Sequence, residues 1–368
     1  MNITKEAIVD ALSKVRYPGS GKNLIEAGMV ENICIEGKQV SFSLRFAKAK
    51  DPFIKSVVKA SETAILTYVD KDVDIRDHIS IVLPEEAVAP SERPLLPGVK
   101  NIVAVFSGKG GVGKSTVTAN LAVALAREGY KVGLLDADVF GPSMPRMFDA
   151  EDARPTLDVV DGRELISPIE VHGVKLLSMG FFVDKHSPVL WRGTMASNAL
   201  RQLISDGNWG ELDYFLIDMP PGTSDIHLTM VQTIALTGAV VVTTPQQIAL
   251  IDAIKGIGMF LEDKINVPVL GLIENMAWFT PAELPENKYY IFGRDGGKKL
   301  AEELGIPLLA QIPLVQSICE GCDNGEPSAI QEDSLSGIYF RQLAHSLVER
   351  VAYRNEHLSP TEKVSMNS

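Results

Sequence analysis

A glycine-rich octapeptide between an apolar run and a helical pattern constrains this chain more than any other feature. The apolar run is Ile102–Phe106, and the helical pattern covers Ser115–Glu128. Glycines let successive backbone N–H groups converge on an anion, and a helix that begins there adds its positive end. The sequence therefore predicts a strand, a phosphate-binding loop and a helix in succession. The loop reads Gly108-Lys109-Gly110-Gly111-Val112-Gly113-Lys114-Ser115.

The spacing within this loop predicts the roles of single residues. Gly-x4-Gly-Lys-Ser is the P-loop pattern, so Lys114 is expected to reach the β- and γ-phosphates and Ser115 to bind Mg²⁺. The next helical residue, Thr116, is included in the predicted nucleotide site. A chance match is disfavoured because the expected strand and helix flank the loop on the correct sides.

Apolar runs alternate with helical patterns from Asn101 onward. Short apolar runs separated by helices indicate βαβ units and a sheet that is buried on both faces. The predicted fold class is therefore α/β, with a mostly parallel sheet and helices on both faces. After the first strand we expect strands at Val132–Leu135, Tyr214–Ile217, Ala239–Thr243, Val267–Ile273 and Leu308–Ile312, and a last helix at Ser334–Tyr353.

Composition divides the chain into four segments. Residues 84–99 hold four prolines and three glutamates and predict an extended linker. Residues 100–356 are expected to form the nucleotide-binding domain, and residues 357–368 a disordered tail. Residues 1–83 predict a small α+β domain, with helices at Ile3–Val15 and Asp51–Tyr68 and strands at Met29–Ile35, Gln39–Phe46 and Ile79–Leu83.

Acidic residues end two of the expected strands. Asp136 and Asp138 follow one of them, and Asp218 follows another. The carboxyl ends of parallel strands share one edge of the sheet with the phosphate loop, so these acids are expected beside Mg²⁺. Asp218 has the position of a Walker B acid, which holds Mg²⁺ directly or through water. The turn after it contains Gly222, whose backbone N–H is expected to meet a γ-phosphate.

Charge and cysteine content restrict the partners and the compartment. The formal net charge is −12, and most of it falls after residue 99. An acidic surface argues against nucleic-acid binding, and no run of 18 uncharged apolar residues predicts a membrane span. Three cysteines and a charged N-terminus without a signal-peptide core suit the cytoplasm. Cys34 is expected in the core, and the six histidines lack metal-ligand spacing.

Several motifs, taken together, resemble a known family. The extra lysine, Lys109, resembles that of the deviant P-loop in MinD-like ATPases. Further motifs resemble the Mrp/ApbC branch, a group of iron–sulfur cluster carriers, over about residues 100–350. The first domain resembles the SufT/PaaD-like domain that often precedes them. These motifs are Leu135–Ser143, Trp191-Arg192-Gly193, Asp213–Thr223 and Thr244–Leu250.

The resemblance implies activity, cofactor and partners. It implies a homodimer that binds and hydrolyses ATP with Mg²⁺, in which Lys109 touches the nucleotide of the partner subunit. By the same resemblance Asp138 positions the attacking water, Asp136 supports the metal shell, and Asn275 lies against the adenine ring. The partners implied are scaffold or client proteins of iron–sulfur cluster assembly, and the cargo is a 4Fe-4S cluster that bridges the dimer.

The cysteines depart from the family pattern. The family has a Cys-x-x-Cys pair where this chain has Ala277–Glu283, and the first domain lacks a cysteine at Ala47–Phe53. A displaced pair occurs at Cys319 and Cys322. Its spacing suits two thiolates on one iron–sulfur cluster, a redox dithiol, or two incidental cysteines at a helix start.

Three functions therefore remain open. The leading hypothesis is an ATPase that carries or assembles iron–sulfur clusters. The alternative is a cysteine-independent regulatory or scaffold ATPase that acts through protein partners. A positioning ATPase would need a basic amphipathic helix or a DNA-binding patch, and the tail Ser359–Ser368 is neither.

Overall fold

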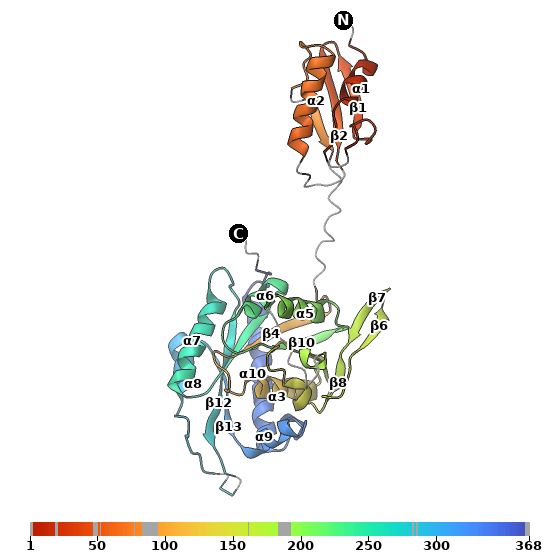
Figure 1. Ribbon diagram of the computed structural model, residues 1–368. Coiled ribbons are helices and arrows are strands. Elements are labelled where there is room, and N and C mark those ends of the chain that lie inside the picture. Colours follow the sequence, from red (N-terminus) through yellow and green to blue (C-terminus); the bar gives the residue numbers. More distant parts are fainter. Residues whose placement is uncertain are drawn as a thin grey trace. The chain divides into compact units, whose positions relative to one another are not determined.

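The chain forms two compact units, Met1–Arg93 and Pro94–Ser368, in a computed structural model (Figure 1). Within these units the structure describes residues 3–18, 21–46, 51, 53–76, 78–82, 95–160, 162–182, 193–281, 283–284 and 286–364.

The first unit packs two helices on a three-stranded sheet. The hairpin β1–β2 is antiparallel, and β3 joins β2 in parallel. Apolar side chains from both helices and from β2 form the core, and Ile8, Phe42 and Ile65 among them are almost fully buried. The predicted α+β character of this unit is confirmed. Its elements are α1 (Lys5–Ser13), β1 (Val30–Glu36), β2 (Gln39–Arg45), α2 (Ile54–Tyr68) and β3 (Ile79–Val82).

The prediction that Cys34 lies in the core is wrong. Cys34 lies on β1 with an exposed side chain, while Ile33 and Ile35 on either side pack against the core. The register of β1 against β2 shifts between Glu31 and Cys34, and Asn32 has a positive φ of 52°. Side chains alternate between the two faces of a strand, so Cys34 points away from the core when its neighbours point inward.

The second unit is built on an eight-stranded sheet in the order β13-β12-β11-β4-β10-β5-β9-β8. Neighbouring strands run parallel except for the antiparallel pair β8–β9. The predicted α/β class with a mostly parallel sheet is confirmed. The strands are β4 (Val99–Phe106), β5 (Val132–Asp136), β8 (Ile169–Val171), β9 (Val174–Ser178), β10 (Leu212–Asp218), β11 (Gly238–Thr243), β12 (Val269–Phe279) and β13 (Leu308–Leu314).

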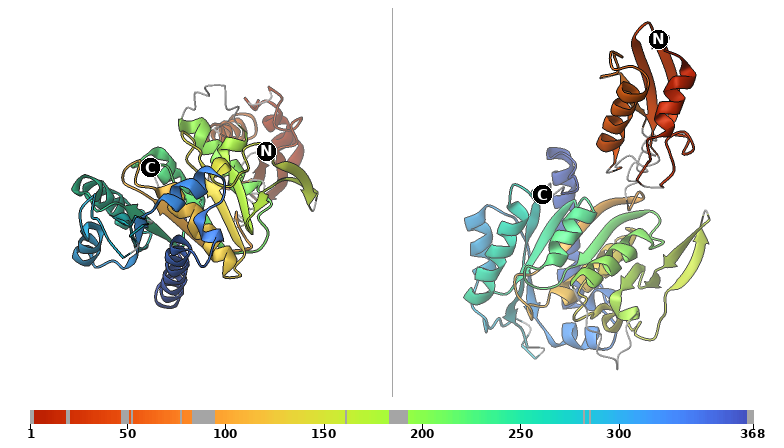
Figure 2. Two further views of the ribbon diagram at one scale, coloured as in Figure 1. Left: turned by 90° about the horizontal axis from the view of Figure 1, so that it is seen from below. Right: turned by 45° about the horizontal axis from the view of Figure 1, so that its top comes forward.

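Helices cover both faces of this sheet (Figure 2). The central strand β4 shows the division, because Ala104 and Phe106 join one core while Val103 and Val105 join the other. Helices α5 to α8 pack on the first core and α3 and α10 on the second. The helices are α3 (Lys114–Arg127), α4 (Met144–Met147), α5 (Gly193–Ser205), α6 (Asp225–Thr233), α7 (Gln247–Leu261), α8 (Gly296–Leu304), α9 (Gln316–Asp323) and α10 (Leu335–His357), with 3-10 turns at Met179–Phe181 and Ser328–Ile330.

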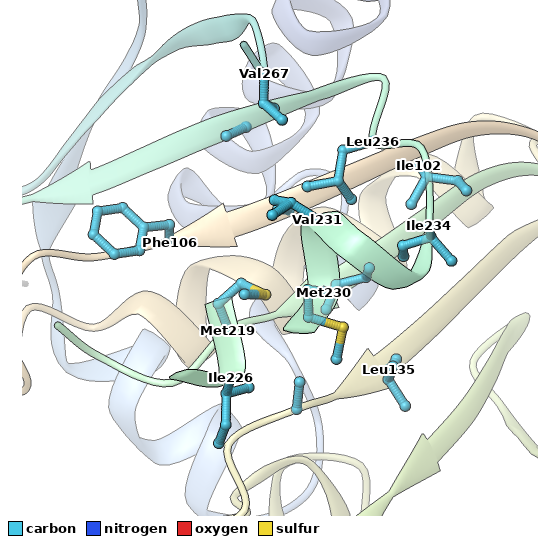
Figure 3. Close-up of a cluster of buried hydrophobic side chains, with 14 of the residues drawn as sticks. Ile102, Phe106, Leu135, Met219, Ile226, Met230, Val231, Ile234, Leu236 and Val267 are labelled. Atoms are coloured by element: carbon cyan, nitrogen blue, oxygen red, sulfur yellow. The ribbon is translucent and has the colours of Figure 1, made fainter. Parts of the chain in front are cut away.

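Helix α6 fixes the position of the segment that follows β10. Its residues Ile226 and Met230 belong to the first core, together with Met219 (Figure 3). Both side chains are almost completely buried. The helix is therefore held firmly at the edge of the sheet where β10 ends.

The segment from 156 to 178 contains four strands that the hydrophobic pattern did not predict. Two of them, β6 (Thr156–Val160) and β7 (Arg163–Ser167), form a separate antiparallel ribbon. Every residue of β6 is exposed, so its sequence lacks the contrast between buried and exposed positions from which a strand is predicted. The other two, β8 and β9, extend the large sheet.

The predicted linker and tail both reach too far into the folded unit. Residues 84–94 lie outside the described residues, but Leu96 is buried in the first core and β4 begins at Val99. At the other end, helix α10 runs to His357, and the Val364 N–H donates to the Val231 carbonyl at 3.1 Å. Composition marks both segments as polar, but backbone hydrogen bonds and a few apolar side chains attach them to the unit.

Buried Arg354 explains why the chain stays ordered beyond α10. Its Nη2 donates to the Ser359 carbonyl and to Thr361 Oγ1, each at 2.7 Å. A buried guanidinium needs such acceptors, and here the segment after the helix supplies them. Residues 365–368 lie outside the described residues. Among the described helices, none has the length and hydrophobicity needed to cross a membrane.

Candidate nucleotide-binding site

The phosphate loop owes its shape to glycines at two positions. Gly111 and Gly113 have φ values of 82° and 81°, which side-chain-bearing residues rarely adopt. A Cβ on Gly113 would overlap the amide nitrogen of Asn275. The Ser107 hydroxyl donates to the Lys109 carbonyl at 3.0 Å and closes the loop at its entrance. Helix α3 then begins at Lys114, so its positive end faces the loop.

Four side chains meet where the loop enters α3. Lys114 Nζ lies 2.6 Å from Asp218 Oδ2, and the Ser115 hydroxyl donates to the same oxygen at 2.7 Å. The Thr118 hydroxyl donates to Asp218 Oδ1 at 2.8 Å. Lys114 and Asp218 are buried, with 6% and 0% of their side chains exposed. The carboxylate and the hydroxyls are oxygen ligands of the kind that Mg²⁺ prefers, and the lysine can form charge-assisted hydrogen bonds to anionic oxygens.

Asp136 lies beside Asp218, because the two residues are paired in register on β5 and β10. Its Oδ2 accepts from the Ser178 hydroxyl at 2.9 Å and from the Met144 N–H at 3.2 Å. Burial, and then the charge of Asp218, raise the pKa of Asp136 to about 7 against the opposing effects of Ser178, Lys114 and Met144. Near neutral pH this carboxyl can therefore hold or release a proton.

Asp138 lies half-buried two residues further along the chain. Its Oδ1 accepts from the Gly141 N–H at 3.2 Å, which holds the side chain at the edge of the sheet. Burial raises the pKa of Asp138, and the charge of Lys114 opposes this effect. Asp138 therefore lies within electrostatic reach of Lys114, at the edge of the sheet that carries the phosphate loop.

Lys109 and Gly108 occupy the outer part of the loop. The Lys109 side chain is exposed, and it has no ion-pair partner within the part of the chain that the structure describes. Gly108 approaches α7 so closely that a Cβ there would overlap the Asp252 carbonyl. Gly110 lies near Pro221, in the turn that follows β10.

Two predicted nucleotide contacts make other interactions in this structure. The Gly222 N–H donates to the Ser107 carbonyl at 2.9 Å, and Gly222 has a positive φ of 76°. Asn275 Nδ2 donates to the Val112 carbonyl at 2.8 Å and so holds the phosphate loop. The γ-phosphate and adenine contacts of these residues stay predictions. Thr116 is half-buried, and its carbonyl accepts from the Asn120 amide at 2.8 Å.

The displaced cysteine pair lies on α9, where its two thiols have different environments. Cys319 is exposed, and the nearby charge of Asp323 raises its pKa. Cys322 is buried, and the Asn120 amide donates to its sulfur at 3.7 Å. Burial raises the pKa of Cys322 to about 11. Metal ligation needs thiolates, and neither environment favours one.

Three residues of the site were not predicted from the sequence. Thr118 holds Asp218, Ser178 holds Asp136, and His227 lies on α6 behind the turn at Gly222. Thr118 follows Lys114 by four residues, so both lie on one helical face, and this spacing is a usable signal. Ser178 carries no such signal, because only the pairing of β5 with β9 brings it to Asp136.

Two family models of known proteins match this chain, one over each unit. A family model described as the NUBPL iron-transfer P-loop NTPase matches residues 98–348. The chain belongs to this family. A second model, described as an iron-sulfur cluster assembly protein, matches residues 5–75. The resemblance seen in the sequence motifs is therefore confirmed for both parts of the chain.

Individual relatives of this P-loop NTPase carry consistent names. An iron-sulfur cluster carrier protein from Synechocystis is 40% identical over 353 residues, which cover 95% of this chain and 98% of that protein. A protein of the same name from Escherichia coli is 50% identical over 266 residues, 72% of this chain and 70% of its own length. A nucleotide-binding protein from Archaeoglobus fulgidus, solved in complex with ADP, has 36% identity and a TM-score of 0.57, and the match covers 68% of this chain and 94% of that one.

The residues of the site fit the cofactors of such an NTPase. ATP with Mg²⁺, predicted from the sequence, agrees with membership of the family. The Ser115 hydroxyl and the Asp218 carboxylate are the hard oxygen ligands that Mg²⁺ prefers, and Lys114 supplies a positive charge for phosphate oxygens.

Proposed function

We propose that this protein is a dimeric ATPase that hydrolyses ATP in order to carry or assemble iron–sulfur clusters in the cytoplasm. The observation that carries the proposal is the buried group of Lys114, Ser115 and Asp218 at the start of α3, with Asp138 beside it. The choice of an iron–sulfur cluster as cargo is based on the names of the relatives, which are iron-sulfur cluster carrier proteins.

Each residue has a role in the proposed hydrolysis. Lys114 and the loop amides bind the phosphates, and Ser115 and Asp218 hold Mg²⁺. Asp138 orients the attacking water, and Asp136 supports the metal shell. Gly222 gives its N–H to the γ-phosphate, and Asn275 contacts the adenine. Mg²⁺ neutralises the charge that develops on the phosphate oxygens when it is bound.

In this proposal Lys109 of one subunit contacts the nucleotide that is bound to the other subunit. The side chain projects from the loop into solvent without an ion-pair partner among the described residues, which suits a cation supplied to another molecule. A cation delivered in trans raises the rate of phosphoryl transfer by about 10³-fold or more. The dimer is therefore the active species.

Mixing two inactive variants tests both the dimer and the trans role. Lys109→Ala and Asp138→Asn should each lower ATP hydrolysis by at least about 100-fold. Their mixture should regain about a quarter of wild-type activity, because half of the dimers are mixed and each holds one complete site. A mixture as inactive as its components would count against Lys109 acting in trans.

A cysteine-independent scaffold or regulatory ATPase is the second candidate. It is favoured by the burial and the raised pKa of Cys322, which oppose thiolate formation on α9. In that case the protein acts on scaffold or client proteins of cluster assembly without ligating the cluster itself.

Anaerobic iron–sulfur reconstitution distinguishes the two candidates. Iron and sulfide are counted in the wild-type protein and in Cys319→Ala/Cys322→Ala. A cluster that is present in the first and lost in the second would support direct carriage by this pair. No cluster in either, with ATP hydrolysis intact, would support the scaffold function.

A further inference from the structure

His227 lies between the strand that leads into the phosphate loop and the turn that follows β10. It is on the first turn of α6, a few residues after Asp218 and the Pro-Pro-Gly turn. Only 1% of it is exposed. The ring packs edge-on against Phe106, with 5.4 Å between centroids and 83° between planes. Phe106 ends the strand that leads into the phosphate loop, so His227 connects this strand to the turn after β10.

The hydrogen bonds of the ring define its protonation. The Ser224 N–H donates to Nδ1 at 3.1 Å, and the Ser224 hydroxyl lies 3.1 Å from the same atom. Burial lowers the pKa of His227 to about 4, although the backbones of Ser224 and Pro220 oppose this effect. The imidazole is therefore neutral at pH 7. Because Nδ1 accepts a hydrogen bond, the single proton is on Nε2.

The Nε2–H group is a buried donor for which no described residue provides an acceptor in full hydrogen-bond geometry. Buried polar groups are almost always paired, so an unpaired one indicates strain or a partner that arrives in another state. The backbone of Pro220 acts on the ring, and proline has no N–H, so the group that faces His227 is the Pro220 carbonyl. The ring thus faces Ser224 at one end of the turn and Pro220 at the other.

Gly222, in the turn between Pro220 and Ser224, has a backbone N–H that can bond either to the protein or to a γ-phosphate. Gly222 donates its N–H to the Ser107 carbonyl at 2.9 Å, so this amide is occupied while the turn keeps its present position. For Gly222 to reach a γ-phosphate, that bond must break and the turn must move. A shift of the turn also changes the distance from the Pro220 carbonyl to Nε2.

We propose that His227 is a positioning residue that holds both ends of the turn when the Gly222 amide leaves Ser107 and binds the γ-phosphate. Nδ1 keeps the Ser224 amide, and Nε2–H takes the Pro220 carbonyl as its acceptor. This inference rests on the proposed function, because it assigns to the proposed ATPase site a contact that forms when ATP is bound. No proton is transferred and no covalent bond changes.

Substitutions at His227 test the proposal through the γ-phosphate. His227→Leu removes both polar contacts, whereas His227→Gln keeps an acceptor and a donor on one side chain. His227→Asn has the same groups on a side chain one bond shorter, which cannot span the turn. We expect kcat for ATP to fall about 10- to 100-fold in His227→Leu and His227→Asn, and to stay within about threefold in His227→Gln.

Nucleotide affinities separate positioning from a merely structural effect. ADP lacks the γ-phosphate, so its dissociation constant should stay within about twofold in all three variants, while that of a non-hydrolysable ATP analogue rises in the Leu and Asn variants. An equal loss of ADP and ATP-analogue affinity, or an unchanged kcat in His227→Leu, would overturn the proposal.

A different result would show that the proposed ATPase function, and not the role of His227, is wrong. A wild-type protein that binds ATP but does not hydrolyse it would refute the ATPase proposal. The ratio of ATP-analogue to ADP affinity still tests His227 in that case, because it depends on binding alone. An unchanged ratio in His227→Leu would overturn the inference on its own.

Discussion

Each buried acidic residue at this site is held by polar partners from other elements of the fold. Asp218 is buried with Lys114 against one oxygen and Thr118 against the other. Asp136 has Ser178 and the Met144 amide as donors. A buried carboxylate needs such partners, since an unpaired charge in the interior is costly. The acid positions follow from the sequence, whereas Ser178 reaches Asp136 only through the pairing of β5 with β9.

Thr118→Val tests how strongly the supporting hydroxyl matters. Valine has the shape of threonine but leaves Asp218 Oδ1 without its donor, so the free energy of unfolding should fall by about 1–3 kcal/mol. Thr118→Ser keeps the hydroxyl and should lose less than about 1 kcal/mol. Urea denaturation of the three proteins measures the difference. A Thr118→Val variant as stable as the wild type, together with a loss in Thr118→Ser, would show that packing of the methyl group, and not the hydrogen bond, is responsible.

The raised pKa of Asp136 predicts a pH dependence of stability in the metal-free protein. The folded-state pKa is about 7 and the ordinary value 3.8, so this contribution to stability is full below pH 4 and is lost as the pH rises through 7. The slope is at most about 1.4 kcal/mol per pH unit. Asp136→Asn cannot titrate and should flatten it. Denaturation in EDTA between pH 4 and 8 checks this, and identical slopes would contradict the assignment.

Whole elements explain which parts of the fold were predictable. Strands β4, β5, β10 and β11 each contain a continuous apolar run because helices cover both of their faces, and their sequences show this. The exposed strand β6 has no buried side and therefore no pattern to recognise. Cys34 illustrates the same limit, since a register shift in β1 changes which side chains face the core. The phosphate loop was predictable because its chemistry depends on residues adjacent in sequence.

A glycine substitution tests the connection between β4 and α3. Gly113→Ala should lower nucleotide affinity at least about tenfold, because Gly113 has a left-handed backbone and a Cβ would overlap Asn275. Gly258→Ala is the control, since a Cβ there meets open space on helix α7, and it should be neutral or stabilising by up to about 1 kcal/mol. Titration with a fluorescent ATP analogue compares them. Tight binding by Gly113→Ala would contradict the loop geometry.

Alkylation tests the cysteine environments on α9. At pH 8, iodoacetamide should label exposed Cys34 and Cys319, whereas buried Cys322, with a pKa of about 11, should react more than about 100-fold more slowly than Cys34. Peptide mass spectrometry after timed labelling gives the rates. Rapid labelling of Cys322 in the folded protein would mean that α9 opens and that both thiols are available to a cluster.

At the scale of the whole molecule, the nucleotide site lies within a single unit. Every described residue of the site falls in Pro94–Ser368, which has its own sheet and its own two cores. The first unit has a separate core and matches a different family model. Nucleotide binding is therefore expected to be a property of the second unit alone.

A fragment comprising residues 94–368 tests this independence. It should bind ATP with a dissociation constant within about twofold of that of the whole chain, because no described residue of the site is removed. Isothermal titration calorimetry compares the two proteins, and circular dichroism confirms that the fragment is folded. A folded fragment that fails to bind ATP would show that the first unit contributes to the site.

The hydrogen bond from Val364 to Val231 affects how this protein is handled in the laboratory. Val231 is on α6, the helix that begins directly after the turn at Gly222. An affinity tag or a dye attached after the last residue would therefore load a segment that is fastened to this helix. A purification tag belongs at the other end of the chain, on the unit that has its own core.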